Sequence, residues 1–271
     1  MKRICRLCDG EKLSPLLDMG SHPIAHHFPK RAGEGEFVHP VVLSFCEDCG
    51  LSQIVDPVPA ERLYGEYVCL SSWKPQPHVP RLLDLIRDLP GLIETSPILE
   101  IGCNDGDFLR ALREKGFTNL FGIEPAKDAF AGLEKRGFKC IRGYFNEEMA
   151  RTLLIAQGKF HLIVVRQVLE HIGDLNSFLK GVRSLLFPGG YVLIEVPDFN
   201  FSIKNRDYSA IWEEHVNYFC RNTLRRILSR HKIDVLNEET ANFSGQALVV
   251  IGRLGEEPVP LKEMSPVDHE E

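Results

Sequence analysis

Glu100-Ile101-Gly102-Cys103-Asn104-Asp105-Gly106 is the stretch of sequence that decides the fold. It ends the apolar run 98–101 with an acid and leads into a glycine-rich turn. The next apolar run, 120–124, ends in a second acid, Glu124. A glycine turn after one buried strand and a carboxylate after the next are typical of a nucleoside cofactor bound at the edge of a parallel sheet. We therefore expect an enzyme.

The sequence on either side of this turn alternates short apolar runs with amphipathic stretches. Such alternation predicts an α/β fold with a mostly parallel sheet and helices on both faces. The pattern predicts strands at 98–101, 120–124, 139–142, 160–165, 191–196, 233–237 and 247–251. It predicts helices at 78–89, 107–115, 127–136, 146–155, 175–186 and 223–229.

The residue types in the first turn suit a bound cofactor. Gly102 permits a tight turn and Gly106 permits close approach of the backbone. Asn104 stands where a glycine is commoner, and asparagine tolerates the left-handed region better than most residues. The helix expected from Asp107 offers free backbone N–H groups. The carboxylate of Glu124 can accept hydrogen bonds from both hydroxyls of a ribose.

This pattern resembles class I S-adenosylmethionine-dependent methyltransferases over roughly residues 95–252. The resemblance implies a Rossmann-like, seven-stranded sheet in which five parallel strands precede a hairpin with one antiparallel strand. It implies that the first turn binds the amino-acid part of S-adenosylmethionine and that Glu124 binds its ribose. The Phe187-Pro188-Gly189-Gly190 turn before the fifth strand is frequent in that family. A nicotinamide-binding domain is the alternative, although it usually keeps the middle glycine of G-x-G-x-x-G.

The rest of the cofactor site is less specified by the sequence. Phe145 could pack on the adenine ring and Asn146 could hydrogen-bond to it, or the two could be a core aromatic and a helix cap. Gln167 follows the fourth predicted strand. The predicted cofactor-binding residues are Glu100, Gly102, Asn104, Gly106, Glu124, Phe145 and Gln167.

Four of the eight cysteines form two close pairs, Cys5-x2-Cys8 and Cys46-x2-Cys49. Two such pairs predict a closed, four-thiolate structural zinc site. Redox-active dithiols are the alternative, but the segment around the pairs is poor in core residues and needs a metal to fold. If one cysteine is not a ligand, the histidines of this segment could replace it: His22, His26 and His27.

A second specific segment, 211–219, contains Glu214-His215 followed by Tyr218-Phe219. Together with the cysteine pairs and the G-x-N-D-G turn, it resembles the zinc-containing sugar C-methyltransferases that act on nucleotide-linked 4-keto-6-deoxysugars. That resemblance implies removal of a proton from a carbon next to a carbonyl. His215 would be the base, Glu214 would orient it or bind a hydroxyl, and His171 or Tyr67 would donate to the enolate oxygen.

The sequence also departs from that group. Those enzymes continue for a further domain that helps to bind the nucleotide, and Gln167 and Trp212 replace residues common in the group. The acceptor could therefore be a smaller metabolite, a second subunit could complete the site, or methyl transfer could go to oxygen or nitrogen. A non-catalytic, zinc-containing interaction module on a methyltransferase fold is the alternative of another class.

The composition limits the remaining possibilities. The chain has 271 residues and a net charge of −6, which argues against nucleic acid or an anionic membrane as the main partner. No signal peptide or membrane-spanning run is present in the sequence, so we expect a cytoplasmic protein with a small-molecule substrate. We expect a zinc-binding module over 1–60, a connecting segment over 61–94, the cofactor-binding domain over 95–252, and a disordered acidic tail over 253–271.

Overall fold

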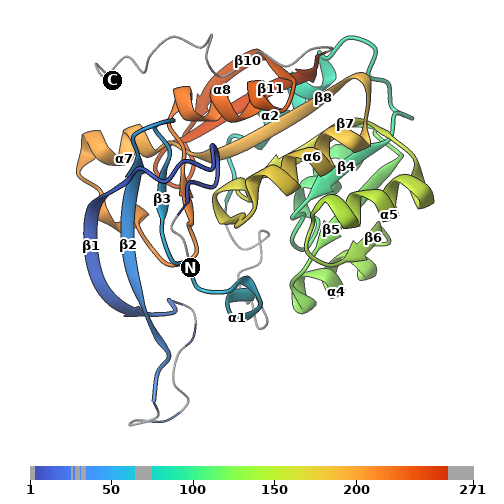
Figure 1. The fold of residues 1–271 in the computed structure, drawn as a ribbon. Helices are drawn as coiled ribbons and strands as arrows, with labels where there is room; N and C mark the ends of the chain where they lie inside the picture. Colours follow the sequence, from blue (N-terminus) through green and yellow to red (C-terminus); the bar gives the residue numbers. More distant parts are fainter. Residues whose placement is uncertain (1–3, 26, 28–30, 32–34, 65–74, 256–271) are drawn as a thin grey trace.

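The computed structural model describes residues 4–25, 27, 31, 35–64 and 75–255. Its larger sheet has seven strands in the order β10-β11-β8-β7-β4-β5-β6 (Figure 1). The strands from β6 to β8 are parallel, and β11 runs antiparallel to both β8 and β10. The strands are β4 (Ile98–Ile101), β5 (Leu120–Glu124), β6 (Lys139–Arg142), β7 (Phe160–Arg166), β8 (Leu186–Pro197), β10 (Ile233–Ala241) and β11 (Ala247–Leu254).

Helices cover both faces of this sheet because its central strands are apolar on both sides. Alternate residues of one strand enter different cores: Leu99 packs in the core that includes Phe178, and Ile98 in the core that includes Phe108. One face carries α2 (Val79–Arg87), α3 (Asp107–Glu114) and α4 (Lys127–Lys135). The other carries α5 (Glu147–Gln157), α6 (Leu175–Leu185) and α8 (Arg221–Arg230).

The predicted strands and helices of this domain are all present, with small shifts at their ends. β8 begins at Leu186, so the Pro188-Gly189-Gly190 turn lies within the strand rather than before it. β11 continues to Leu254, so Arg253 and Leu254 belong to the sheet and the tail was predicted to begin too early. Residues 256–271 lie outside the described residues. No helix in the described ranges is long and apolar enough to cross a bilayer.

The N-terminal segment contains a sheet, although the sequence predicted no strands there. β1 (Leu13–Pro23), β2 (Val38–Cys46) and β3 (Ser52–Ile54) form an antiparallel sheet whose fourth strand is β9 (Asn217–Tyr218). β1 is partly exposed along its length, so it lacks the apolar alternation that reveals a half-buried strand. The short helices α1 (Ala60–Tyr64) and α7 (Phe199–Asn205), and the 3-10 turns η2 (Leu169–His171) and η3 (Tyr208–Ala210), were also not predicted.

The N-terminal sheet is continuous with the chain that follows β8, because β3 pairs with β9. Beside that pairing, the backbone N–H of Ile54 donates to the carbonyl of Val216 at 3.0 Å. The side chain of Arg6 donates to Gln53 Oε1 at 2.9 Å and to the Val216 carbonyl at 3.3 Å. The two halves of the molecule therefore share backbone hydrogen bonds as well as a common core.

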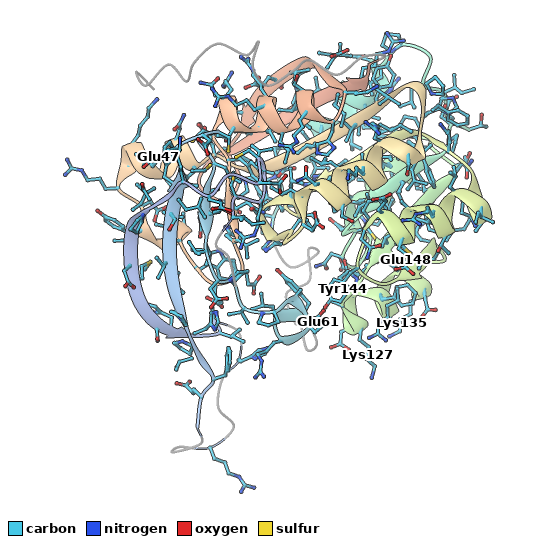
Figure 2. The ribbon with its side chains drawn as sticks, in the orientation of Figure 1. Glu47, Glu61, Lys127, Lys135, Tyr144 and Glu148 are labelled. Carbon is cyan, nitrogen blue, oxygen red and sulfur yellow. The ribbon has the colours of Figure 1, made fainter. Side chains whose placement is uncertain are left out.

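A second contact joins α1 to the cofactor-binding domain. Figure 2 shows Glu61 and Tyr144 close together on the surface. The Tyr144 hydroxyl donates to the carbonyl of Ala60 at 3.3 Å. This bond links the end of the N-terminal segment to the loop after β6.

A substitution at Gly122, in the middle of β5, can test how closely the turn after β4 packs against the sheet. A Cβ at this position would lie 2.6 Å from Cys103 Sγ and 3.2 Å from Leu109 Cδ1. We expect Gly122→Ala to lower the free energy of unfolding by about 1–3 kcal/mol, as overpacked cores do. Gly173→Ala is the matched control, since nothing lies within 4 Å of its added Cβ and its φ is not positive. Urea denaturation of both variants checks this, and equal stabilities would contradict the packing described here.

Candidate active site and metal centre

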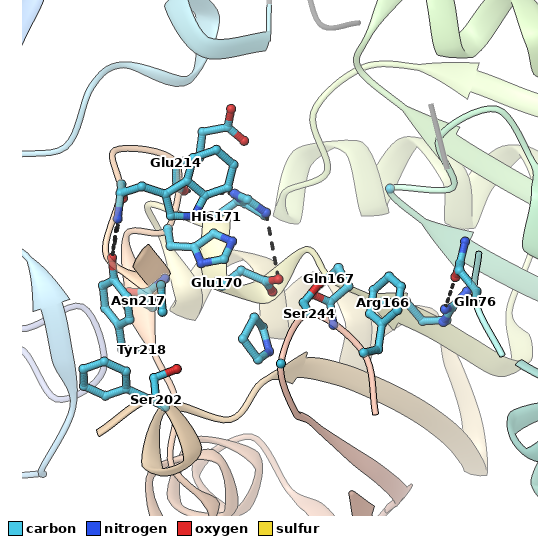
Figure 3. A pocket seen from close by; sticks show the side chains of 18 of the residues that line it. Gln76, Arg166, Gln167, Glu170, His171, Ser202, Glu214, Asn217, Tyr218 and Ser244 are labelled. Carbon is cyan, nitrogen blue, oxygen red and sulfur yellow. Dashed lines mark hydrogen bonds and ion pairs between the residues drawn. The ribbon is translucent and has the colours of Figure 1, made fainter. Parts of the chain in front are cut away.

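A cavity of about 830 Å³ opens at the carboxyl ends of β4, β7 and β8, where ligands bind in sheets of this kind. Its lining brings together two groups of residues predicted from the sequence (Figure 3). The first group comes from the turn after β4 and from the end of β7: Glu100, Gly102, Asn104 and Gln167. The second comes from η2 and the segment before β9: His171, Glu214 and His215.

The turn after β4 has the backbone geometry that its sequence predicts. Gly102, Asn104 and Gly106 all have positive φ, at 70°, 50° and 81°. Gly106 is the N-cap of α3, and the Asn104 side chain accepts the backbone N–H of Asp105 at 2.8 Å. α3 therefore begins directly after this turn, and its first N–H groups have no acceptor within the helix.

Glu124 is bound by the backbone on both carboxylate oxygens. Oε2 accepts the N–H of Asn104 and Oε1 accepts the N–H of Ala126, each at 2.8 Å. Burial raises the pKa of Glu124 to about 7, although these two N–H groups favour the ionised form. Each oxygen keeps a lone pair that could accept a ribose hydroxyl. Glu124 and Gly106 do not themselves line the cavity as the described residues outline it.

Glu100 is the second buried acid beside the turn. Its Oε2 has no hydrogen-bond partner among the residues that the structure describes. Burial raises its pKa to about 8, and nearby Arg166 opposes part of that increase. A buried acceptor without a donor is costly unless a ligand supplies one. The protonated amine and the sulfonium of S-adenosylmethionine are cationic groups that fit such a site.

An ion-pair network that the sequence did not reveal closes this end of the cavity. Arg166 donates to Glu195 Oε2 at 2.7 Å and to Gln76 Oε1 at 2.6 Å. Gln167 donates to Glu195 Oε1 at 3.1 Å, and its φ of 51° is unusual for a residue with a long side chain. The network fixes the left-handed Gln167 against β8 and neutralises a buried acid at the cofactor end.

The residues predicted for the adenine pocket have a structural role here. The Asn146 side chain accepts the N–H of Met149 and caps α5. Phe145 is buried against Phe178, with ring centroids 5.1 Å apart, and does not line the cavity that the described residues form. Asn146 is therefore a helix cap and Phe145 a core aromatic, as one of the two interpretations of the sequence proposed. Contact of Phe145 with adenine stays a prediction.

At the other end of the cavity, two imidazoles lie next to each other. The rings of His171 and His215 have centroids 4.9 Å apart. His171 Nδ1 lies 2.9 Å from the Tyr64 hydroxyl and 2.9 Å from the carbonyl oxygen of Glu214. Tyr67 falls outside the described residues, whereas Tyr64, only three residues earlier, contacts the site. The sequence analysis named Tyr67, whose role stays a prediction, and it did not name Tyr64.

Backbone contacts position the segment that supplies His215. The Val216 N–H donates to the carbonyl of Glu170 at 2.8 Å. Asn217 Nδ2 donates to the carbonyls of Leu169 and Ile172, at 3.2 Å and 2.8 Å. η2 and the segment before β9 are therefore bound to each other, which keeps His171 and His215 adjacent.

The protonation states at this end follow from burial. Burial, and then the neighbouring His171, lower the pKa of His215 well below its usual value, so its ring is neutral. Burial, and then the charge of Glu213, raise the pKa of Glu214 to about 8. Burial also raises the pKa of Glu170 to about 8. The site therefore contains a neutral imidazole, that of His215, beside two carboxyl groups that gain and lose a proton close to neutral pH.

The four cysteines predicted as metal ligands form one cluster. Their sulfur atoms all lie within 4.8 Å of one another, with Cys5 to Cys49 and Cys8 to Cys46 at 3.5 Å. Four sulfurs bonded to zinc at about 2.3 Å lie about 3.8 Å apart, so this cluster fits a tetrahedral Zn²⁺. Exposed His22 instead contacts the Met19 carbonyl, while His26 lies outside the described residues. The zinc is structural because the four thiolates leave no open position for substrate.

α8 connects the zinc site to the larger sheet. Arg226 donates to the carbonyl of Cys49 at 2.9 Å, and Arg230 donates to the carbonyl of Leu7 at 2.7 Å. Cys5, Leu7 and Phe219 belong to the same buried core. Loss of zinc would therefore disturb the segment that presents His215.

Removal of one zinc ligand tests this connection. We expect Cys46→Ser to lose about one equivalent of zinc, to lower the melting temperature and to abolish turnover, since zinc supplies folding energy to such modules. Cys140→Ser is the control, because Cys140 lies on β6 and outside the cluster. Metal analysis and thermal melts check both variants. Full zinc content in Cys46→Ser would contradict the assignment.

The raised pKa of Glu124 predicts how cofactor affinity depends on pH. The role predicted for Glu124 is that its ionised form accepts two ribose hydroxyls, and in that role binding competes with protonation below pH about 7. We expect the Kd of S-adenosylhomocysteine to rise toward tenfold per unit as the pH falls below 7, and to level off above it. Calorimetric titrations from pH 5.5 to 8.5 check this. Glu124→Gln should bind more weakly and with less pH dependence, and an unchanged profile would contradict the role of Glu124.

Comparison with protein-family models agrees with this geometry. A model described as a methyltransferase domain matches residues 76–238, which is more than half of the chain. A second model, for a zinc-binding domain, matches residues 5–64. The two matches contain the turn after β4 and the four cysteines, respectively.

Among curated proteins, the chain is similar to C-methyltransferase NovU of Streptomyces niveus, with 28% identity over 91% of this chain and 59% of that protein. It is also similar to a ubiquinone biosynthesis O-methyltransferase of Bordetella avium, with 27% identity over 51% of this chain and 56% of that protein. The chain thus spans less than two thirds of the length of either relative.

Solved structures show the same fold. A methyltransferase from Archaeoglobus fulgidus aligns with a TM-score of 0.50 and 20% identity, over 65% of this chain and 92% of that one. Magnesium protoporphyrin IX methyltransferase from Synechocystis, solved with bound S-adenosylhomocysteine, aligns with a TM-score of 0.51 and 12% identity. The alignment covers 71% of this chain and 91% of that one. The matches to family models, the order of the strands and the cysteine cluster all agree. This chain therefore belongs to the zinc-containing, S-adenosylmethionine-dependent methyltransferases of class I.

Proposed function

We propose that this protein transfers a methyl group from S-adenosylmethionine to a carbon next to a carbonyl, in a sugar that is nucleotide-linked or in a similar small metabolite. One observation carries the proposal. A single cavity is lined both by the glycine-rich turn after β4 and by the Glu214-His215 pair with His171. The similarity to a C-methyltransferase over 91% of the chain supports carbon as the acceptor atom.

The residues around the cavity suit the chemistry of carbon methylation. A carbon next to a carbonyl becomes a nucleophile only after it loses a proton, so the site needs a base and a group that stabilises the enolate oxygen. S-adenosylmethionine supplies an electrophilic methyl group when it is bound. The protein then has to bind both reactants in line, and the shared cavity provides that positioning.

The Glu214-His215 pair is the proposed source of the base. Both residues line the cavity, and Glu214 is fully buried. His215 is the first candidate because its neutral ring has a nitrogen lone pair available at neutral pH. Glu214 is adjacent to it and can orient the acceptor or remove the proton itself.

His171 and a tyrosine are the proposed partners of the enolate oxygen. The Glu214 carbonyl can only accept, so His171 donates to it from Nδ1. A neutral His171 then has no proton on Nε2, and donation to an enolate would require its charged form. Tyr64 beside His171, and Tyr67 outside the described residues, are the other candidate donors.

O-Methylation of a small metabolite is the second candidate function. The similarity to ubiquinone biosynthesis O-methyltransferases favours it, although that similarity covers about half of the chain. An oxygen acceptor also needs a base, so the same residues would serve. What distinguishes the two reactions is whether a carbon-bound hydrogen of the acceptor is removed.

Hydrogen exchange tests carbon methylation directly. With S-adenosylhomocysteine bound and a nucleotide-linked 4-keto-6-deoxysugar in D2O, we expect deuterium to enter the carbon next to the carbonyl. His215→Gln should slow both this exchange and methyl transfer by about 10²–10⁴-fold, the usual contribution of a general base. Nuclear magnetic resonance of the sugar checks the exchange, and calorimetry with S-adenosylhomocysteine checks that the variant still binds cofactor.

His22→Gln is a matched control, because His22 is an exposed histidine on β1. Methyl transfer to oxygen without any carbon exchange would favour the second candidate. Full turnover by His215→Gln would contradict the role of His215.

A further inference from the structure

A second cavity lies between α6, the end of α8 and the chain that follows Cys8. Its volume is about 430 Å³, which is within the usual range of small-molecule sites. All the side chains that line it are polar or charged, and none of them lines the larger cavity. This cavity is therefore separate from the methyltransferase site, and the mechanism above does not use it.

Three cationic side chains meet at this second cavity. Lys180 and Arg183 lie one turn apart on α6, and Arg230 is the last residue of α8. Burial, and then the charges of Arg230, Arg183 and Lys180, lower the pKa of His231, which also lines the cavity, to about 4. The three positive charges therefore act on the same place, and an anion there would offset their mutual repulsion.

The two acids that line the cavity do not neutralise all of this charge. Asp174 caps α6 by accepting a backbone N–H, and the dipole of the helix offsets its charge. Asp9 forms an ion pair with Arg230 at 3.3 Å. Among the residues that the structure describes, no carboxylate lies within ion-pair distance of Lys180 or Arg183. The cavity therefore presents two cations that still lack an anionic partner within this part of the chain.

Arg230 connects the cavity to the zinc site. Its guanidinium donates to the Leu7 carbonyl at 2.7 Å, between the first two metal ligands along the chain. A guanidinium has five N–H groups, so Arg230 can bind an anion while it keeps this bond. His231 Nε2 lies 3.2 Å from Asn176 Oδ1, which holds the end of α8 against α6. The cations therefore come from elements that are already fixed to one another.

From this arrangement we propose that the cavity between α6 and α8 binds a phosphate-bearing anion through Lys180, Arg183 and Arg230. Arginine can donate two parallel hydrogen bonds to phosphate oxygens, and lysine adds a compact positive charge. A diphosphate has enough charge and enough acceptor oxygens to contact all three cations. Free pyrophosphate and the diphosphate of a nucleotide share this chemistry.

A bound diphosphate would join α6, α8 and the first zinc-binding turn. A ligand that binds only the folded protein stabilises it by mass action, so the melting temperature should rise with the concentration of the anion. This inference does not rest on the proposed function, because Lys180, Arg183 and Arg230 take no part in methyl transfer.

Calorimetry in phosphate-free buffer measures this site without turnover. The full-length, zinc-loaded protein is titrated with pyrophosphate, and metal analysis verifies that zinc stays bound. We expect binding that weakens as NaCl is added, because salt screens exposed charges. Arg183→Gln should bind pyrophosphate about tenfold more weakly, since a hydrogen bond between charged groups contributes about that factor.

Two further variants separate loss of a ligand from other effects. Lys180→Gln changes an exposed side chain of the same cavity and should also weaken pyrophosphate binding. Arg151→Gln is the matched control, because it removes one positive charge from an exposed arginine of α5 outside the cavity. Arg151→Gln should bind pyrophosphate as the wild type does. All three variants should keep their zinc and their affinity for S-adenosylhomocysteine.

A nucleoside diphosphate identifies the source of the phosphate groups. If the wild type binds it more tightly than pyrophosphate and Arg183→Gln weakens both, the cavity takes a nucleotide. If pyrophosphate binds at least as tightly and Arg183→Gln weakens it, the cavity takes the free anion. No pyrophosphate binding by the wild type, or equal binding by Arg183→Gln and Arg151→Gln, would overturn the site even if methyl transfer proceeds.

Discussion

The pairing of β3 with β9 is the constraint on which the rest of the site depends. Only two residue pairs form it, Ser52 with Tyr218 and Gln53 with Asn217. It nevertheless joins the zinc-binding segment to the chain that follows β8. The residues immediately before β9 include His215. The Val216 N–H donates to the Glu170 carbonyl of η2, and the side chain of Asn217 in β9 donates to the Leu169 carbonyl. The effect of zinc on the site is therefore indirect. Zinc holds the N-terminal strands in place, these strands hold β9 through its pairing with β3, and β9 positions the acceptor end of the cavity.

The larger sheet provides the other half of the site through its topology. β4 lies between β5 and β7, and all three strands are parallel. From β4 the strand order continues toward β6 on one side and toward β8 on the other, so the turn after β4 lies where the order reverses. The cofactor end is built from backbone N–H groups and buried acids, whereas the acceptor end is built from imidazoles and carboxyl groups of η2 and the 212–218 segment. In the proposed function, this one cavity has two kinds of chemistry, with cation binding at one end and proton transfer at the other.

The sequence predicted the parts of this arrangement that depend on short-range pattern. β4 and β5 are buried on both faces, and they have the bounds that their apolar runs predict. β6 at the edge of the sheet is partly exposed and also has its predicted bounds. The cysteine spacing likewise predicted the cluster. What it missed depends on tertiary context. β9 is two residues long and has no pattern of its own, β1 is exposed, and Tyr64 reaches His171 only because α1 packs beside η2. Glu170 looks like any acid beside a histidine until its burial is known.

The account makes one central claim, that the methyl donor and the acceptor meet between the turn after β4 and the histidines His171 and His215. A crystal structure with bound S-adenosylhomocysteine tests it most directly. The account predicts the amino-acid part of the ligand beside Glu100, its ribose on Glu124 and its sulfur facing the two histidines across the cavity. A ligand whose sulfur faces away from His171 and His215, or that binds outside this cavity, would contradict it.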